Sequence, residues 1–133
     1  MAFKVVDGLR TIEFGTPGQS RKELTDLVID GNKRATAGTA QEYLDENEVI
    51  EHIGEELYLL DNDEKVVGKV RVTEVTQCAF SEVPDRFALA EAEGDLSGDD
   101  FRRSHSEFWN RIGIEVNDQT PIVLVYFDLV EKY

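Results

Sequence analysis

The chain has 133 residues and carries 14 basic against 28 acidic side chains, a net charge of −14 at pH 7. This balance excludes nucleic-acid binding through bulk charge, because phosphate contacts require many lysines and arginines. No run of about 18 apolar residues is present, so no membrane span is expected. The length predicts a single domain over residues 1–133. A start without a secretory signal and a lone Cys78, expected as a small strand or core residue, predict a cytoplasmic protein.

The first quarter of the chain predicts a strand, a helix and a turn. Residues 9–14 read as an opening strand, and a Gly-Thr-Pro-Gly breaker follows them. From about 19 to 30 apolar residues recur at helical spacing, with Ser20 as the expected cap. Gly31 lies where a glycine typically ends a helix. The run Gly-Asn-Lys-Arg-Ala-Thr at 31–36 therefore begins at a helix exit.

The middle of the chain predicts a short acidic helix and a hairpin. Thr39, with a glutamate three residues later, resembles a capping box for a helix over 40–49. Residues 56–63 and 64–77 read as two strands joined by an acidic turn. The apolar alternation of the second strand changes phase near Thr73, which predicts a β-bulge there.

The last third predicts two helices and a buried strand. A short helix begins at about Pro84, and Ser97 caps an aromatic helix over 97–113 whose apolar stripe places Trp109 in the core. Residues 121–130 are nearly all apolar, as in a strand covered on both faces. Strands mixed with helices, without regular alternation, favour an α+β barrel over a doubly wound sheet.

Known catalytic motifs are absent from the sequence. The glycine-rich stretch at 15–22 lacks the Gly-Lys-Ser/Thr ending of a phosphate loop, and no nucleophile-elbow, zinc or EF-hand pattern occurs. His52 and His105 are the only histidines, and neither has a second imidazole nearby. We therefore expect no metal and no cofactor.

Polar residues from four segments remain as a candidate constellation. They are Lys33 and Thr36, Arg71 and Glu74, the acidic loop residues Glu91, Glu93 and Asp95, and Arg102 with His105. A lysine beside a threonine hydroxyl can activate it as a nucleophile, and a carboxylate such as Glu93 can hold the lysine. The residues alone favour a simpler interpretation, in which Lys33 and Arg34 are exposed cations that follow a helix-ending glycine.

Two of these segments resemble a known family. The run Gly-Asn-Lys-Arg-Ala-Thr-Ala at 31–37 is similar to the G-x-K-x-A-T motif of the ASCH-domain family. The stretch at 91–105 is similar to that family's acidic E-G-D loop and its W-R-x-x-H helix, with Phe101 in place of the tryptophan. Gly38 stands where many members carry a larger side chain. The resemblance implies a PUA-like mixed β-barrel with flanking helices and a cleft lined by both motifs.

The resemblance implies a function in that cleft. The first expectation is binding of a short or single-stranded RNA element or a modified nucleoside, with no duplex DNA and no membrane as partner. Its ligand-binding residues are then Gly31, Arg71, Asp95, Arg102 and His105. The alternative is a hydrolase of the acetylcytidine amidohydrolase or ribonuclease type, in which the catalytic residues are Lys33, Thr36 and Glu93. A third hypothesis, drawn from charge alone, is that the acidic block at 42–64 docks a basic protein.

Overall fold

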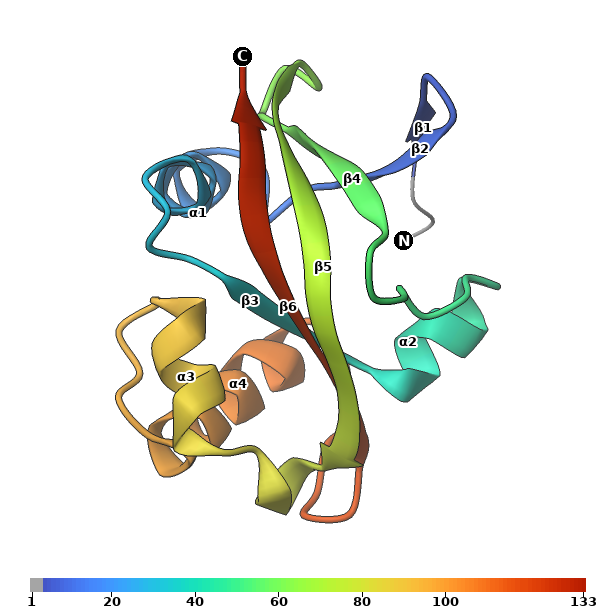
Figure 1. Ribbon diagram of the computed structural model, residues 1–133. Helices are drawn as coiled ribbons and strands as arrows, with labels where there is room; N and C mark the ends of the chain where they lie inside the picture. The colour runs from blue at the N-terminus through green and yellow to red at the C-terminus, as the bar shows by residue number, and fades with distance from the viewer. Residues whose placement is uncertain (1–3) are drawn as a thin grey trace.

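The computed structural model describes residues 4–133 as one mixed sheet with helices packed on it (Figure 1). The elements in chain order are β1 (Val5–Val6), β2 (Leu9–Ile12), α1 (Gln19–Ile29), β3 (Ala35–Thr39), α2 (Ala40–Asp45), β4 (Glu56–Leu60), β5 (Val66–Ala79), the 3-10 turn η1 (Phe80–Glu82), α3 (Asp85–Glu91), α4 (Gly98–Arg111) and β6 (Pro121–Lys132).

The sheet has six strands in the order β1-β2-β4-β5-β6-β3, so the mixed α+β class is as expected. Only the β2–β4 pair is parallel, and the other neighbours are antiparallel. The predicted closed barrel is not confirmed. β1 has two residues and β3 five, and within residues 4–133 these two edge strands do not pair with each other.

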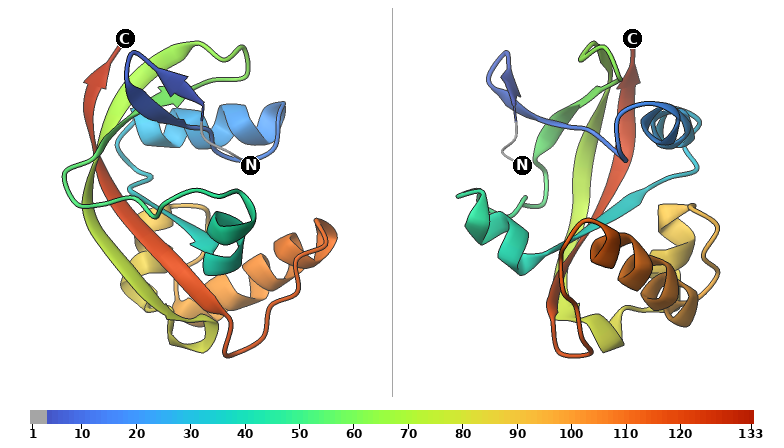
Figure 2. Two further views of the ribbon diagram at one scale, coloured as in Figure 1. Left: turned by 90° about the vertical axis from the view of Figure 1, so that its right-hand side faces the viewer. Right: turned by 180° about the vertical axis from the view of Figure 1, so that it is seen from behind.

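The two longest strands, β5 and β6, are adjacent inside the sheet. They pair over almost their whole length and bend into an arc, with α1, α2 and α4 on its inner side (Figure 2). The register shifts between Val72 and Glu74, which leaves Thr73 as the extra residue of a bulge. The phase change in the sequence thus correctly predicted the bulge, which adds to the bending of the strand.

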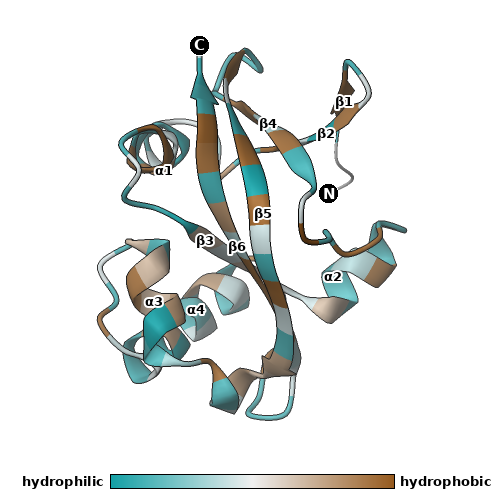
Figure 3. Ribbon diagram, in the orientation of Figure 1, coloured by the Kyte–Doolittle hydropathy of each residue, from teal (hydrophilic) through white to brown (hydrophobic). Residues whose placement is uncertain are grey.

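β6 is buried on both faces, as its apolar run predicted. One core cluster joins Val123, Val125 and Phe127 to α1 and to strands β2, β4 and β5. A second cluster joins Ile122, Leu124 and Tyr126 to α3 and α4. Alternate side chains of a strand point to opposite faces, so one strand serves both cores. Apolar (brown) and polar (teal) bands alternate along β5 and β6 in Figure 3. Trp109 lies in the second cluster and is 2% exposed, as expected.

Local capping signals account for the starts of α2 and α4. The side chains of Thr39 and Glu42 form a reciprocal capping box at α2, and the Ser97 hydroxyl accepts from Asp100 N at α4. The predicted Ser20 cap is wrong. α1 begins at Gln19, and its cap is Gly18, two residues before Ser20 and without a side chain. The longest helix, α4, has 14 residues, and no helix within residues 4–133 is long and apolar enough to cross a bilayer.

Candidate cleft between the sheet and α4

A cleft with two adjoining parts runs across the inner side of the sheet. Both parts share a wall built by β3 and the segment that follows β2. That wall consists of Glu13, Phe14, Thr36 and Ala37. The larger part has a volume of about 440 Å³ and the smaller about 230 Å³. Together they match the size of sites that take small molecules.

Each end of the cleft has its own chemistry. The acidic end is the larger part, and its polar lining includes Glu91, Glu93, Asp95 and His105. The tyrosine end is the smaller part and is lined by Tyr43 and Glu51 together with other carboxylates. Carboxylates outnumber cations at both ends, so the cleft does not provide a basic groove.

Lys33 lies beneath the acidic end and is 1% exposed. Its Nζ donates to Glu93 Oε2 at 2.6 Å, to Ala35 O at 2.8 Å and to Glu91 O at 3.4 Å. Three acceptors use the full donor capacity of an ammonium group. Nζ also lies 5.3 Å from the centre of the Phe14 ring. Lys33 therefore ties the start of β3 to the end of α3.

The backbone explains why Lys33 turns inward while its neighbour does not. Lys33 N donates to Leu27 O at the end of α1, and Arg34 N donates to Ala90 O in α3. The segment is thus clamped between two helix ends before it enters β3. The Arg34 side chain is exposed and pairs with Asp128 on the outer surface.

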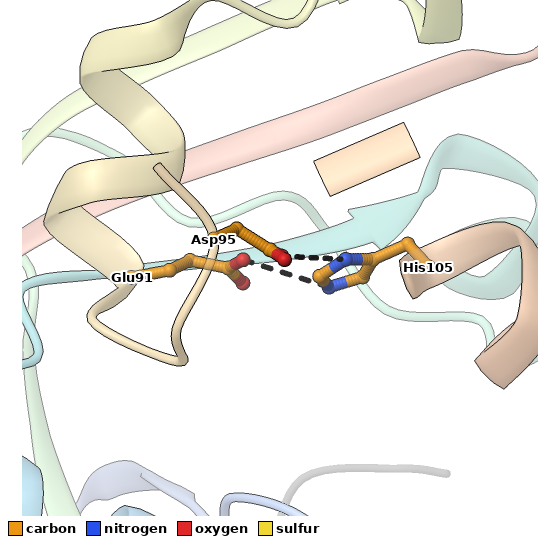
Figure 4. A group of neighbouring side chains, drawn as sticks. All are labelled: Glu91, Asp95 and His105. Carbon is orange, nitrogen blue, oxygen red and sulfur yellow. Dashed lines mark ion pairs between the residues drawn. The ribbon is translucent and has the colours of Figure 1, made fainter. Parts of the chain in front are cut away.

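His105 from α4 meets two carboxylates from α3 and the loop after it (Figure 4). Its Nε2 lies 3.5 Å from Glu91 Oε1, and its Nδ1 lies 4.0 Å from Asp95 Oδ2. The ring stacks on Phe101 with 3.9 Å between centroids, which fixes its plane. Ser104 donates to Asp95 Oδ2 at 2.7 Å and holds that carboxylate near the ring.

The protonation of this group is perturbed. Burial raises the pKa of Glu91 above its usual value, and His105 and Lys33 oppose this only in part. Burial by itself lowers the pKa of His105, but the carboxylates of Glu91 and Glu93 outweigh it and leave that pKa raised. Both shifts mean that the His105–Glu91 pair holds its protons more tightly than the free groups do.

The tyrosine end contains a second buried carboxylate. Glu51 is 4% exposed and accepts a hydrogen bond from the Tyr43 hydroxyl at 2.7 Å. Burial raises the pKa of Glu51, and it also raises that of Tyr43. Glu55 nearby forms two hydrogen bonds with the Arg10 guanidinium, at 2.7 and 2.8 Å. Several members of the acidic block at 42–64 therefore have internal partners, which weakens the hypothesis that the block docks a basic protein.

Comparisons with known proteins identify the family and agree with the fold. A family model described as the ASCH domain matches residues 10–131, nearly the whole chain. The chain belongs to the ASCH-domain family. The match confirms the resemblance that the two motifs indicated, including its PUA-like fold. No curated protein matches the sequence.

Three solved structures resemble this ASCH domain. A crystal structure of an ASCH domain from Lactobacillus crispatus JV V101 is 26% identical, with a TM-score of 0.78 over 91% of this chain and 79% of that one. A protein from Enterococcus faecalis V583 is 25% identical, with a TM-score of 0.77 over 91% and 76%. A mutant ASCH protein from Zymomonas mobilis is 8% identical, with a TM-score of 0.55 over 80% and 63%, and supports the fold alone.

Five of the eight predicted site residues meet at the acidic end of the ASCH domain. Thr36, Glu93, Asp95 and His105 line it, and Lys33 contacts Glu93 from below. The family resemblance implied a cleft lined by both motifs, and these residues lie together in one. This grouping does not establish the role of any of these residues.

The other three predicted residues lie elsewhere. Arg71 pairs with Glu56 on the neighbouring strand at 2.7 Å, because β4 and β5 place these two residues opposite each other. Arg102 donates to Val83 O at 3.0 Å and Asp99 at 2.6 Å. Gly31 has φ +82 at the end of α1, a backbone role, and lies outside the cleft.

Sequence reasoning gave no role to two buried carboxylates of the cleft. Glu91 appeared only as part of the acidic loop, but it is the last residue of α3 and is 2% exposed. Glu51 lay in a run of acidic residues with nothing to distinguish it. Only its hydrogen bond to Tyr43 and its burial single it out, and neither is visible in the sequence.

Proposed function

We propose that this ASCH domain binds a modified nucleoside, free or at the end of a short single-stranded RNA, in the cleft. The observation that carries the proposal is the lining of the acidic end, where carboxylates stand beside aromatic side chains. Carboxylates accept hydrogen bonds from exocyclic amino groups and ribose hydroxyls. Aromatic faces stack on bases. The relation of the family to RNA-binding proteins supports the same ligand class.

Charge argues for the nucleoside rather than its phosphates. Lys33 donates its hydrogen bonds to acceptors within the protein, and the Arg102 guanidinium donates to Val83 and Asp99, so neither cation is free to bind a phosphate. Arg111 is the exposed cation at the rim of the acidic end, and among residues 4–133 it forms no ion pair. One rim cation can accommodate a single terminal phosphate, whereas a longer polyanion meets the carboxylates and a net charge of −14.

The partly exposed aromatic residues at the two ends are Phe108 and Tyr43. Trp109 belongs to the core, and Tyr58 lies on β4 beside Tyr133 rather than in the cleft. We therefore assign base stacking to Phe108 at the acidic end.

Calorimetry with cytidine, acetylcytidine and adenosine, each beside its 5′-mono- and triphosphate, tests the proposal. The expected order is nucleoside or monophosphate first and triphosphate last, with duplex RNA weakest. Phe108→Ala should weaken nucleoside binding about tenfold, the scale of one lost base stack. Glu107→Gln, an exposed neighbour on the same helix, serves as the matched control. Tighter binding of triphosphates or duplexes than of nucleosides contradicts the proposal.

A hydrolase acting on acetylcytidine is the second candidate. The 2.6 Å contact between Lys33 and Glu93, with Thr36 on the same cleft wall, favours it. Against it, Nζ of Lys33 already has three acceptors and no lone pair turned toward a hydroxyl proton. Binding without turnover is therefore the better-supported reading.

Acetate release from acetylcytidine by the wild type, Lys33→Ala and Thr36→Ala separates the two candidates. Turnover that both substitutions abolish would establish the hydrolase. Nucleoside binding without acetate release would leave the binding function alone. A parallel incubation with short single-stranded RNA covers the ribonuclease form of the same candidate.

A further inference from the structure

Glu91, Asp95 and His105 form a compact three-residue group at the acidic end of the cleft. Each offers one oxygen or nitrogen atom, and these atoms all lie within 4.8 Å of one another. The three side chains come from the end of α3, the following loop and α4, and they point toward one another in Figure 4. Convergence from three segments distinguishes the group from a run of acidic residues on one surface.

The hydrogen bonds of His105 indicate which ring nitrogen is free. Nδ1 lies 3.2 Å from Phe101 O, and a carbonyl oxygen can only accept, so Nδ1 carries the hydrogen in this contact. The neutral ring then has its lone pair on Nε2, the nitrogen that faces Glu91. A backbone carbonyl that fixes the opposite nitrogen is the arrangement typical of metal-binding histidines.

Glu91 Oε1 is an unpartnered buried oxygen. The residue is 2% exposed, and within residues 4–133 this atom makes no hydrogen bond. Nε2 of His105 lies 3.5 Å from it, so with a neutral ring a carboxylate oxygen and a nitrogen lone pair face each other. A buried acceptor without a donor is costly, and two facing acceptors need either a proton or a metal ion between them.

We propose that Glu91, Asp95 and His105 bind one divalent transition-metal cation of the Zn²⁺ or Mn²⁺ type. Ligands about 2.1 Å from a tetrahedral ion lie about 3.4 Å apart, close to the 3.5 Å between Nε2 and Glu91 Oε1. Asp95 Oδ2 lies 4.0 Å from the other ring nitrogen, Nδ1, so the side chain must rotate toward Nε2 to supply the third ligand. One imidazole with two carboxylates favours these cations over Ca²⁺ or Mg²⁺, which prefer oxygen ligands alone.

The remaining coordination positions of such a cation face the cleft. His105, Asp95 and Glu91 all line the acidic end, so a bound ion would present itself to whatever occupies it. Lys33 lies 3.9 Å from Glu91 Oε2, on the other oxygen of that carboxylate, and does not block the ion. The test of the metal site does not depend on the nucleoside proposal, because it uses the metal ion alone as the probe.

Calorimetric titration of the chelator-treated full chain with Zn²⁺, Mn²⁺ and Mg²⁺ tests the site. One equivalent of Zn²⁺ or Mn²⁺ should bind with micromolar or tighter affinity and raise the unfolding temperature, with Mg²⁺ much weaker. Co²⁺ substitution should give visible absorption bands that change when the His105 ring is removed. Absence of saturable Zn²⁺ and Mn²⁺ binding up to millimolar metal overturns the proposal.

Conservative substitutions assign the ligands. Asp95→Asn, Glu91→Gln and His105→Gln should each weaken metal binding about tenfold or more. Asp99→Asn and His52→Ala remove an exposed carboxylate and an exposed imidazole outside the group, and should leave the affinity unchanged. Equal affinity in Asp95→Asn and the wild type, or loss of affinity in His52→Ala, overturns the assignment.

A proton is the competing cation between Nε2 and Glu91. Nitrogen-15 spectra of His105 at neutral pH distinguish the two cases. Under the proposal, a ring with hydrogen on Nδ1 alone should show a large shift at Nε2 when Zn²⁺ is added. A doubly protonated ring that Zn²⁺ does not change overturns the proposal.

Discussion

Lys33 Nζ lies 2.6 Å from Glu93 Oε2, although 60 positions separate the two residues in the chain. The contact joins the segment before β3 to the loop after α3 and forms the floor of the acidic end. Lys33 is almost fully buried and Glu93 partly exposed, so the pair faces protein on one side and the cleft on the other.

Replacement of Lys33 by methionine should destabilise the protein by about 3 kcal/mol, because it leaves Ala35 O, Glu91 and Glu93 without their shared donor. Urea unfolding measures this loss. Arg34→Met is the matched control, since Arg34 is an exposed cation one residue away, and its cost should stay within about 0.5 kcal/mol. Equal losses for the two variants would contradict the structural role assigned to Lys33.

Thr36→Val tests the wall shared by both parts of the cleft. The swap keeps the shape of a half-buried strand residue, and among residues 4–133 no hydrogen bond uses the Thr36 hydroxyl. We expect little change in stability but about fivefold weaker nucleoside binding, the equivalent of ~1 kcal/mol. Thr73→Val, at the exposed bulge of β5, should change neither quantity. Unchanged affinity in Thr36→Val would remove this hydroxyl from the binding site.

The pH dependence of stability should reveal the buried Glu51. Burial raises the pKa of Glu51, against the opposing effects of Tyr43 and Arg10, so the folded chain holds this proton more tightly than the unfolded chain. Ionised Glu51 therefore costs stability at neutral pH. The cost declines as pH falls through the folded-state pKa and is absent below the unfolded value of about 4.3.

Glu51→Gln keeps an acceptor for the Tyr43 hydroxyl and removes the charge. It should be more stable than the wild type by on the order of 1 kcal/mol at pH ~7, with the gain lost at pH ~4. Urea unfolding at both pH values provides the measurement, with exposed Glu107→Gln as control. A loss of stability at neutral pH would show that Glu51 is stabilised as a carboxylate.

Two glycines should respond differently to alanine. A Cβ on Gly98 would lie 2.3 Å from Val83 O, so the start of α4 must move, whereas a Cβ on Gly38 would meet only the Tyr43 ring at 3.5 Å. We expect Gly98→Ala to cost about 2 kcal/mol and Gly38→Ala less than about 1 kcal/mol in thermal unfolding. Similar losses of stability in the two variants would mean that the start of α4 moves easily, and that the position of His105 on this helix can move with it.

The order and kind of most elements were predictable because their signals are local. The Thr39 capping box, the Ser97 cap and the bulge at Thr73 each depend on a few neighbouring residues. The Ser20 cap failed because Gly18, with φ +107, turns the chain into the helix two residues earlier. Two competing caps within one turn differ too little in the sequence to be separated.

The site was predictable only in part. The family motifs correctly indicated that Lys33, Thr36, Glu93, Asp95 and His105 come together, without assigning their roles. The motifs did not show that Arg71 and Arg102 lie outside the site, because the partner of an arginine depends on which strand or turn lies beside it. The barrel expectation likewise depended on edge pairing, which two short edge strands do not make.

The sequence by itself determined the charge, the main helices and strands and the family, since composition, periodicity and motif spacing are properties of the chain. Only the tertiary structure decided that Lys33 is buried while Arg34 is exposed. It also decided that Glu91 Oε1 faces His105 without a donor. Burial and partner choice arise from packing between segments tens of residues apart, and no local pattern encodes the distance between them.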